Sequence, residues 1–203
     1  MARQSRVAVA IGWLRVGLPA RIKWRLGMTQ GMDTPDRRVL EDAIIGSLSR
    51  QPGFTRVLFV GCDWYTAHYP SLWPHGVFTT IEPNPKKARH GAQRHIVDVL
   101  QNLRRHVEPG SFDVVICNGV YGWGLNDPHD CEVAFQACIE ALAHGGVLVL
   151  GWNDVPHRDP VPLSKVRALH ALRPWSTPGL KSRHRVHGSA ARHTYDLFVK
   201  PAR

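Results

Sequence analysis

Three short apolar runs, at residues 57–60, 114–117 and 147–150, constrain the fold of this chain most. Each run is continuous rather than alternating with polar residues, and each is followed directly by glycine or asparagine. Strands that are buried on both faces of a parallel sheet have this pattern, because helices cover both faces. The runs therefore predict an α/β fold that is built on a mostly parallel sheet.

Six strands are expected in all. The last one alternates more between apolar and polar residues, which suits a less buried position in the sheet. The predicted strands lie at residues 56–61, 77–81, 95–100, 112–118, 146–152 and 193–200.

Helices are expected between several of these strands. Thr34 and Asp127 each precede a proline, and a capping side chain followed by proline marks the start of a helix. The alternation of strands and helices predicts a Rossmann-like, doubly wound sheet, for which 203 residues suffice in one domain. The predicted helices lie at residues 35–48, 128–144 and 162–172, and Gly145 and Gly146 are expected to end the second.

The composition excludes global disorder, because apolar residues make up 43% of the chain and charged residues 21%. The formal net charge of +10 is unusual. Such an excess attracts phosphates, anionic membrane surfaces or acidic substrates, and it is equally compatible with a solvated basic surface.

The four cysteines form no Cys-x-x-Cys pair, and the 12 histidines form no ladder beside carboxylates. Reduced thiols, no metal site and a cytoplasmic location are therefore expected. No apolar run approaches the roughly 20 residues that a membrane-spanning helix needs.

Residues 1–34 are interpreted as a basic amphipathic segment that precedes the domain at residues 35–203. Tryptophans beside arginines suit a peripheral membrane contact or a lid over a lipid-like substrate, and packing on the domain itself is an equal alternative. The segment begins like a signal peptide, but Arg15 interrupts its apolar run. Retention in the cytoplasm is favoured, with secretion as the lesser alternative.

Three polar or glycine positions lie at the ends of successive predicted strands: Gly61, Glu82 and Asp98. Ligands of doubly wound sheets bind beyond the carboxyl ends of the strands. Glu82 follows Gly61 by 21 residues, which is close to the spacing that places a carboxylate on a ribose hydroxyl. Each position also has a simpler explanation, since Gly61 can merely form a turn and the two carboxylates can cap helices. Their order on three strand ends favours a nucleoside site.

At this point the chain resembles the class I S-adenosylmethionine-dependent methyltransferases over residues 35–200. The resemblance lies in "VLFVGCDWYT", "TTIEPNP", "HIVDVL", "FDVVICNGVYGW" and "LAHGGVLVLGWND". It implies a seven-stranded sheet with an antiparallel final strand, and S-adenosylmethionine as the cofactor. The resemblance places the methionine part of the cofactor at Gly61, Cys62, Asp63, Trp64 and Tyr65, the ribose at Glu82, the adenine at Asp98 and Val99, and the methyl-transfer site at Asn118 and Gly119.

The first motif departs from the family pattern because it holds a single glycine. S-adenosylmethionine has no diphosphate, so the missing glycines count more against a dinucleotide such as NAD than against this cofactor. Asp63 is a candidate for favourable charge beside the sulfonium. Whether Asp63, Trp64 and Tyr65 shape the site or block it stays open at this stage.

The acceptor side is less well defined. Amine-methylating relatives often carry Asn/Asp-Pro-Pro-aromatic after the fourth strand, whereas this chain has Asn-Gly-Val-Tyr at residues 118–121. Candidate general bases and candidate pocket walls lie on the loops that follow the fourth and fifth strands, and surface, capping or core roles are the alternatives. The candidate bases are His129, Asp130, Asp154 and His157, and the candidate walls are Tyr121, Trp123 and Trp152.

The favoured hypothesis is a methyltransferase that modifies a hydroxyl or amine of a small molecule, such as a sugar, a lipid-linked compound or a secondary metabolite. An RNA methyltransferase is the alternative that the net charge suggests. A Rossmann-like binding or partner subunit without catalytic activity is an alternative of another class.

Overall fold

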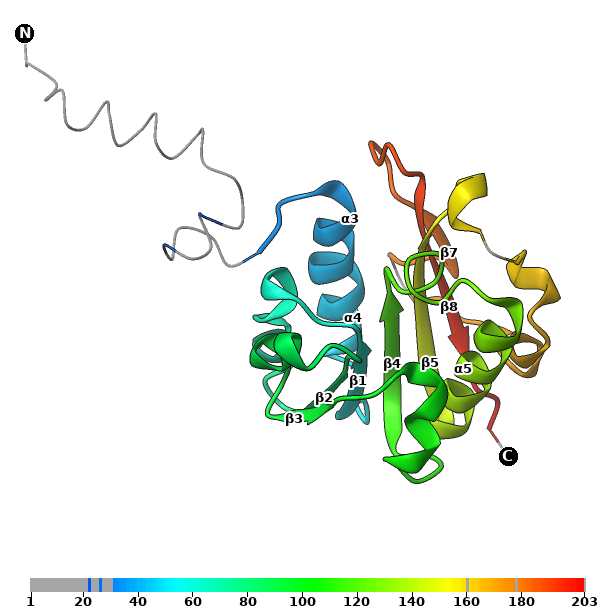
Figure 1. Ribbon diagram of the computed structural model, residues 1–203, viewed down its shortest axis with the longest axis horizontal. Coiled ribbons are helices and arrows are strands. Elements are labelled where there is room, and N and C mark those ends of the chain that lie inside the picture. The colour runs from blue at the N-terminus through cyan, green and yellow to red at the C-terminus, as the bar shows by residue number, and fades with distance from the viewer. Residues whose placement is uncertain (1–21, 23–25, 27–30, 160, 178, 203) are drawn as a thin grey trace, which may run out of the picture.

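The computed structural model describes residues 22, 26, 31–159, 161–177 and 179–202. Within these residues the centre is an eight-stranded sheet in the order β3-β2-β1-β4-β5-β8-β6, with β7 paired to β8 (Figure 1). Strands β1 to β5 are mutually parallel, and β8 runs antiparallel to β5. The strands are β1 (Arg56–Val60), β2 (Val77–Ile81), β3 (Arg94–Ile96), β4 (Phe112–Asn118), β5 (Leu142–Asn153), β6 (Arg173–Pro174), β7 (Arg183–Arg185) and β8 (His193–Val199).

This sheet confirms the Rossmann-like, doubly wound fold with an antiparallel final strand. The apolar runs predicted six strands and the family resemblance implied seven, whereas eight are present, because the short strands β6 and β7 both pair with β8. Strand β3 is only three residues long, so Asp98 follows two residues after its end rather than lying within it.

The helical elements cover both faces of the sheet. Leu40, Ile44 and Leu48 are fully buried, which confirms the apolar stripe of the first helix, although its middle is wound as a π-helix. Thr34 occupies the N-cap without a side-chain capping bond. The longer helical pieces are α3 (Pro35–Arg38), η1 (Val39–Ile45), α4 (Gly46–Leu48) and α5 (Pro128–Ala141), and short 3₁₀ helices include η2 (Trp64–Thr66), η4 (Pro85–His90) and η5 (Leu100–Arg105).

Two predictions about helices were wrong. Residues 162–172 form two separate 3₁₀ helices, η7 (Leu163–Lys165) and η8 (Arg167–Ala171), because the buried Ala168 and Leu169 are held against α5 and the Glu132 carboxylate accepts from the Ala168 amide at 2.8 Å. Helix α5 ends at Ala141, before Gly145 and Gly146. The Lys200 ammonium donates to the carbonyls of Ile139 and Leu142 at 2.7 Å each and so caps the last turn.

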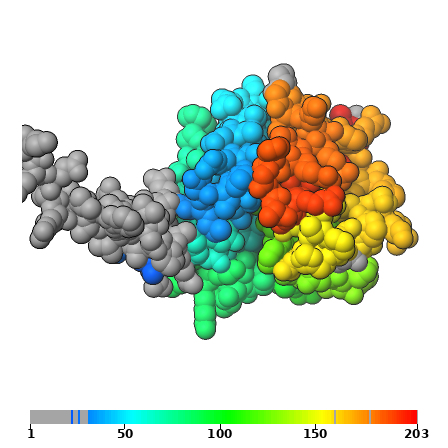
Figure 2. All heavy atoms as spheres, turned by 90° about the horizontal axis from the view of Figure 1, so that it is seen from above, coloured from blue at the N-terminus to red at the C-terminus, as the bar shows by residue number. Residues whose placement is uncertain are grey.

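The core has two layers, one on each face of the sheet. Apolar residues of α5, η5 and η8 pack on one face with Leu58 and Val115. Apolar residues of η1 and α4 pack on the other face with Val57 and Ile116. Seen from above, the blue surface that includes α3 adjoins an orange and red surface of C-terminal residues (Figure 2). The buried Tyr195 of β8 also contacts α3, since its hydroxyl donates to the Asp36 carbonyl at 2.9 Å.

The expected N-terminal segment, residues 1–34, lies largely outside the described residues, so the structure bears on neither its helicity nor its membrane contact. Among the described residues, no helix is long and apolar enough to cross a bilayer.

Candidate active site

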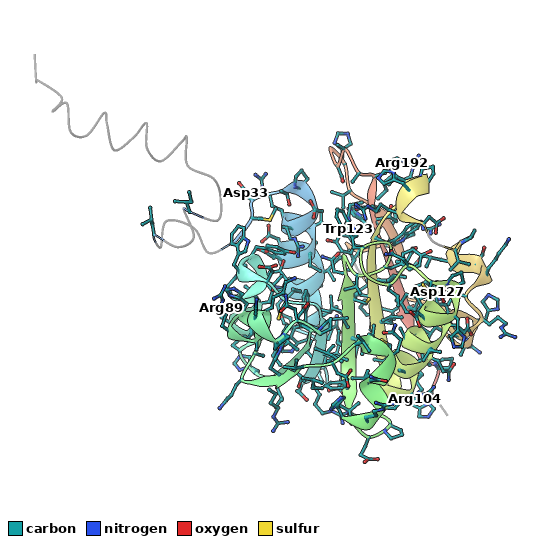
Figure 3. All side chains as sticks on the ribbon, in the orientation of Figure 1. Asp33, Arg89, Arg104, Trp123, Asp127 and Arg192 are labelled. Carbon is teal, nitrogen blue, oxygen red and sulfur yellow. The ribbon has the colours of Figure 1, made fainter. Side chains whose placement is uncertain are left out.

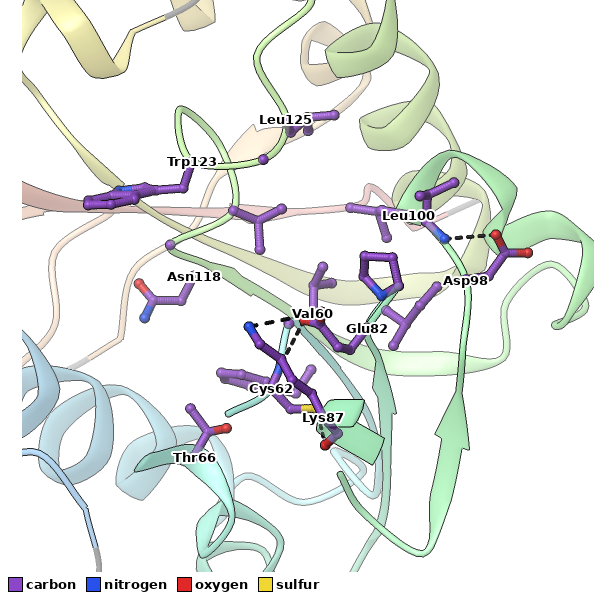
Figure 4. Close-up of a pocket in the computed structure, with 18 of the residues that line it drawn as sticks. Val60, Cys62, Thr66, Glu82, Lys87, Asp98, Leu100, Asn118, Trp123 and Leu125 are labelled. Carbon is purple, nitrogen blue, oxygen red and sulfur yellow. Dashed lines mark hydrogen bonds and ion pairs between the residues drawn. The ribbon is translucent and has the colours of Figure 1, made fainter. Parts of the chain in front are cut away.

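A cavity of about 420 Å³ opens at the carboxyl ends of β1, β2 and β4 (Figure 4). Its volume lies within the roughly 300–1,000 Å³ that small-molecule sites occupy. Nine of the sequence-predicted site residues line it: Gly61, Cys62, Tyr65, Glu82, Asp98, Val99, Asn118, Gly119 and Trp123.

The turn after β1 presents backbone atoms without a side chain to this cavity, at Gly61. Gly61 has a φ of +79°, a conformation that favours glycine, and its amide donates to the Ile81 carbonyl at 2.8 Å. A β-carbon at this position would lie 3.3 Å from a methyl group of Val120. A side chain would therefore both strain the backbone and fill part of the cavity.

The three bulky residues after this turn leave the cavity open. Asp63 caps the 3₁₀ helix η2 in a reciprocal arrangement with Thr66, and its carboxylate lies 3.2 Å from the Lys87 ammonium. Trp64 is buried away from the cavity lining, whereas Tyr65 lines it. Since Lys87 balances the charge of Asp63, the structure does not support Asp63 as a free counter-charge for a sulfonium.

Glu82 places a buried carboxylate at the end of β2. Its two oxygens accept from the amides of Cys62 at 3.4 Å and Asn84 at 3.1 Å, and the Lys87 ammonium lies 4.0 Å away. Backbone amides thus fix the orientation of this carboxylate, and each oxygen keeps a lone pair for a further donor. A ribose diol would supply two such donors.

Asp98 does not offer its carboxylate to the cavity. The side chain points away from the cavity in Figure 4 and accepts from the Val99 amide, Asn102 Nδ2 and His106 Nε2 at 2.8–2.9 Å. These bonds, with His106 first, lower the pKa of Asp98 to about 2. In this structure the carboxylate is held by Val99, Asn102 and His106 and points away from the cavity, against the prediction that it meets an adenine amine.

Asn118 is the most informative residue at the end of β4. It is 6% exposed, and its Oδ1 lies 3.0 Å from His193 Nε2, whose Nδ1 in turn lies 2.7 Å from Asn153 Oδ1. The Asn118 Nδ2 is buried with no hydrogen-bond partner among the described residues. A buried polar group without a partner costs free energy, so this donor at a cavity wall indicates a ligand contact.

A glycine makes this polar connection across three strands sterically feasible. Gly151 of β5 lies between Asn118 of β4 and Tyr195 of β8 in the sheet register. A β-carbon on Gly151 would lie 2.0 Å from Asn118 Oδ1. The Asn118 side chain therefore reaches His193 only because Gly151 has no side chain. Burial lowers the pKa of His193 to about 4, so the ring is neutral near pH 7.

Two of the three expected pocket walls are core residues. Tyr121 is fully buried, and its hydroxyl lies against the Asp159 carboxylate and the Val161 carbonyl. Trp152 is 6% exposed, and its indole N–H donates to Asp196 at 2.8 Å. Trp123 lies at the cavity, beyond the end of β4 (Figure 3), with the Arg158 guanidinium 3.6 Å from its ring centroid.

The structure does not bring the four candidate bases to this cavity. His129 is exposed and, with Asp130, lies in the first turn of α5, where both backbone amides donate to Asp127. Asp154 is ion-paired with Arg185 and Arg192. The fourth candidate, His157, is exposed on a short 3₁₀ helix.

Several lining residues were missed from the sequence. Arg37 comes from α3 and Lys87 from η4, and nothing in their local sequence marks them as ligand-facing. The other missed lining residues include Thr66, Pro83, Leu100, Gln101, Val120, Gly124 and Leu125.

Solved structures give the clearest comparison, since no family model and no curated protein matches this chain. The N-methyltransferase NodS from Bradyrhizobium japonicum WM9 aligns over 83% of this chain and 98% of its own, with a TM-score of 0.64 and 21% identity. A second structure of NodS, in complex with S-adenosyl-L-homocysteine, gives a TM-score of 0.63, again at 21% identity, over 83% of this chain and 89% of its own.

Two further structures widen the comparison. A TehB-like S-adenosylmethionine-dependent methyltransferase from Corynebacterium glutamicum aligns over 81% of this chain and 94% of its own, with a TM-score of 0.56 and 17% identity. RsmC from T. thermophilus, a 16S rRNA methyltransferase, aligns over 85% of this chain but 40% of its own, with a TM-score of 0.55 and 15% identity. The chain therefore has the fold of the class I S-adenosylmethionine-dependent methyltransferases.

Proposed function

We propose that this chain is an S-adenosylmethionine-dependent methyltransferase that acts on a small molecule. The observation that carries the proposal is the meeting of three strand ends at one cavity: the bare turn at Gly61, the oriented carboxylate of Glu82 and the unpartnered amide nitrogen of Asn118. S-adenosylmethionine matches this set, because it has a ribose diol for Glu82 and no diphosphate that would need further glycines. The likeness to a methyltransferase bound to S-adenosyl-L-homocysteine supports the same cofactor.

A small acceptor is favoured over RNA by two observations. The aligned region spans almost the whole of NodS and of the TehB-like protein, but less than half of the rRNA methyltransferase RsmC. Six of the 26 lysines and arginines, and none of the 16 acidic residues, lie in residues 1–30, so the rest of the chain has a net charge of only +4. The domain that holds the cavity therefore lacks the strong basic excess of a phosphate-tracking surface.

An amine acceptor suits the cavity better than a hydroxyl. Burial, followed by the nearby Glu82 carboxylate, raises the pKa of the lining thiol Cys62 to about 11, and the Asp98 carboxylate points away from the cavity. Neither group is suited to remove a proton near pH 7. A neutral amine attacks the methyl carbon with its own lone pair as the carbon–sulfur bond breaks, and it releases its proton afterwards. Alignment of the two reactants then supplies much of the acceleration.

Binding of S-adenosyl-L-homocysteine to the purified protein tests the proposal. Calorimetry should give a saturable isotherm and a ligand-dependent rise in Tm. Glu82→Gln should weaken binding about tenfold or more, because hydrogen bonds to charged groups contribute about 1.5–3 kcal/mol, whereas the exposed Glu108→Gln should not. Absence of binding to the wild-type protein would refute the proposal. Binding without methyl transfer to any of a panel of amines and alcohols would favour the partner-subunit alternative.

A further inference from the structure

Trp123 presents a large aromatic ring at one end of the cavity. It lines the cavity beyond the end of β4 and is 54% exposed. In Figure 4 this ring and Asn118 lie to one side of Glu82, and Leu100 lies to the other side. A nucleoside whose ribose is bound at Glu82 and whose base lies toward Leu100 therefore has its reactive end toward Trp123.

The loop that follows β5 holds this ring in place. The Arg158 guanidinium lies 3.6 Å from the Trp123 ring centroid, and its Nη1 donates to the Gly122 carbonyl at 3.0 Å. Gly122 has a φ of +76°, and a β-carbon there would lie 2.0 Å from the Arg158 carbonyl oxygen. Trp123 lines the cavity and Arg158 does not. The guanidinium therefore covers the side of the ring that is turned from the cavity, and the other side is open to a ligand.

An exposed ring that is already fixed is suited to bind a flat ligand. Two stacked aromatic rings attract each other beyond the effect of the apolar area that they bury, and a fixed ring loses little conformational entropy when it binds. The guanidinium on one side of Trp123 also makes the open side less attractive to a second cation, because two positive charges would then share one ring. Trp123 therefore favours an uncharged aromatic ring over an ammonium group.

The protonation state of the acceptor leads to the same chemical class. An alkyl amine has a pKa of about 10.4, as in lysine, so near pH 7 it is protonated and lacks the lone pair that attacks the methyl carbon. Among the described lining residues, burial raises the pKa of the Cys62 thiol to about 11, Lys87 is paired with Asp63, and Glu82 is assigned to the ribose. These groups are not suited to remove that proton. An aryl amine needs no base, because delocalisation of its lone pair into the ring keeps it neutral.

We propose that the acceptor is an aromatic amine, which stacks on Trp123 and directs its nitrogen to the methyl group of the cofactor. The proposal rests on the proposed function, since it names the acceptor of the same reaction. The nitrogen lone pair forms the bond to the methyl carbon while the carbon–sulfur bond breaks and leaves its electron pair on sulfur. The nitrogen then releases its proton to water. Arg158 is a positioning residue, because it acts through Trp123, and the unpartnered Asn118 Nδ2 can donate to a polar substituent of the acceptor.

Three small amines separate the effect of the ring from that of the charge. Para-toluidine and benzylamine are isomers with one aromatic ring each, but only benzylamine is an ammonium ion near pH 7. Cyclohexylmethylamine is the saturated counterpart of benzylamine. Each is titrated into protein saturated with S-adenosyl-L-homocysteine and followed by NMR, and its methylation by S-adenosylmethionine is followed by mass spectrometry. The wild-type protein should bind para-toluidine at least about fivefold more tightly than the other two amines and should methylate it fastest.

Variants of the two loops assign this preference to its residues. Trp123→Ala should weaken para-toluidine about five- to tenfold and leave the affinity for S-adenosyl-L-homocysteine within about threefold, whereas Trp123→Phe should keep most of the binding. Arg158→Gln should bind benzylamine more nearly like para-toluidine, because the charge behind the ring is gone. The exposed residues Val77 and Arg167 lie outside the cavity lining, so Val77→Ala and Arg167→Gln should behave like the wild type. Thermal unfolding checks that each variant is folded.

Several results would overturn the proposal. One is a wild-type complex that does not bind para-toluidine, or that binds the three amines equally. Another is an unchanged preference for para-toluidine in Trp123→Ala. An equal loss of para-toluidine and of S-adenosyl-L-homocysteine in Trp123→Ala would place Trp123 on the cofactor wall, which also contradicts the proposal. Failure of the wild-type protein to bind S-adenosyl-L-homocysteine is a separate result, which removes the proposed function itself.

Discussion

At the scale of single residues, the neutral state of His193 links the candidate site to stability. The ring lies between Asn118 and Asn153, and a neutral imidazole has one proton for the two amide groups that face it. Because the Asn118 nitrogen is the atom without a partner at the cavity wall, Nε2 donates to Asn118 Oδ1, and the Asn153 amide turns its nitrogen toward Nδ1. His193 thus holds Asn118 with its nitrogen directed away from the ring.

The depressed pKa of His193 predicts a loss of stability in acid. The unfolded chain takes up a proton below a pKa of about 6.5, whereas the folded ring stays neutral until a pKa of about 4. The free energy of unfolding should therefore fall from pH 6.5 toward pH 4, by up to about 3 kcal/mol. Urea unfolding of the wild type and His193→Gln at several pH values measures this, and the variant should have a shallower dependence on pH.

His129→Gln is the matched control for this prediction, because His129 is exposed on α5. It should follow the pH dependence of the wild type. If His193→Gln loses stability as steeply as the wild type between pH 6.5 and 4.5, His193 is not the group responsible.

At the scale of secondary-structure elements, the register of β4, β5 and β8 makes Gly151 a steric requirement. A β-carbon on Gly151 would lie 2.0 Å from Asn118 Oδ1 and 2.7 Å from the Tyr195 ring. Gly151→Ala should therefore displace the Asn118 side chain and destabilise the fold by about 1–3 kcal/mol, the usual cost of overpacking. Chemical denaturation gives the stability, and a crystal structure of the variant gives the position of Asn118.

Gly46→Ala provides the contrast, because its β-carbon would make only ordinary contacts at 3.5 Å within the first helix. It should be neutral or stabilising by up to about 1 kcal/mol, since alanine favours helix. A Gly151→Ala variant as stable as Gly46→Ala would mean that the Asn118 side chain moves at no cost.

The same elements explain how much could be predicted from the sequence. Strands β2 and β4 have the bounds that the sequence predicted, residues 77–81 and 112–118. In β4 the continuous apolar run at residues 114–117 is a local signal for a buried strand. Residues 162–172 were predicted as one helix. They form two 3₁₀ helices, because the Glu132 carboxylate of α5 and apolar contacts with α5 hold them. Gly61 and Glu82 were found by their spacing along the chain. Arg37 and His193 come from distant segments, and only the folded sheet places them beside Asn118.

At the scale of the whole molecule, more than half of the net positive charge lies in residues 1–30, outside the domain that holds the cavity. Residues 1–30 hold six basic residues and no acidic ones, whereas the domain that follows is much closer to neutral. Nonspecific attraction to a polyanion depends on the number of phosphates that basic residues neutralise. We therefore expect such attraction to depend mainly on residues 1–30, and cofactor binding to depend on the cavity alone.

A full-length variant with these six residues changed to glutamine tests this separation. Binding to a single-stranded RNA oligonucleotide should weaken, and the slope of log affinity against log salt should become shallower by up to about 4. Affinity for S-adenosyl-L-homocysteine, measured by calorimetry in the same buffer, should stay within about twofold of the wild type. A charge-matched control changes six basic residues after position 100 that form no ion pair among the described residues: Arg105, Arg158, Lys165, Arg167, Arg173 and Lys181. If this control loses as much RNA affinity as the first variant, the basic residues of the domain bind the phosphates, and an RNA acceptor becomes the better hypothesis.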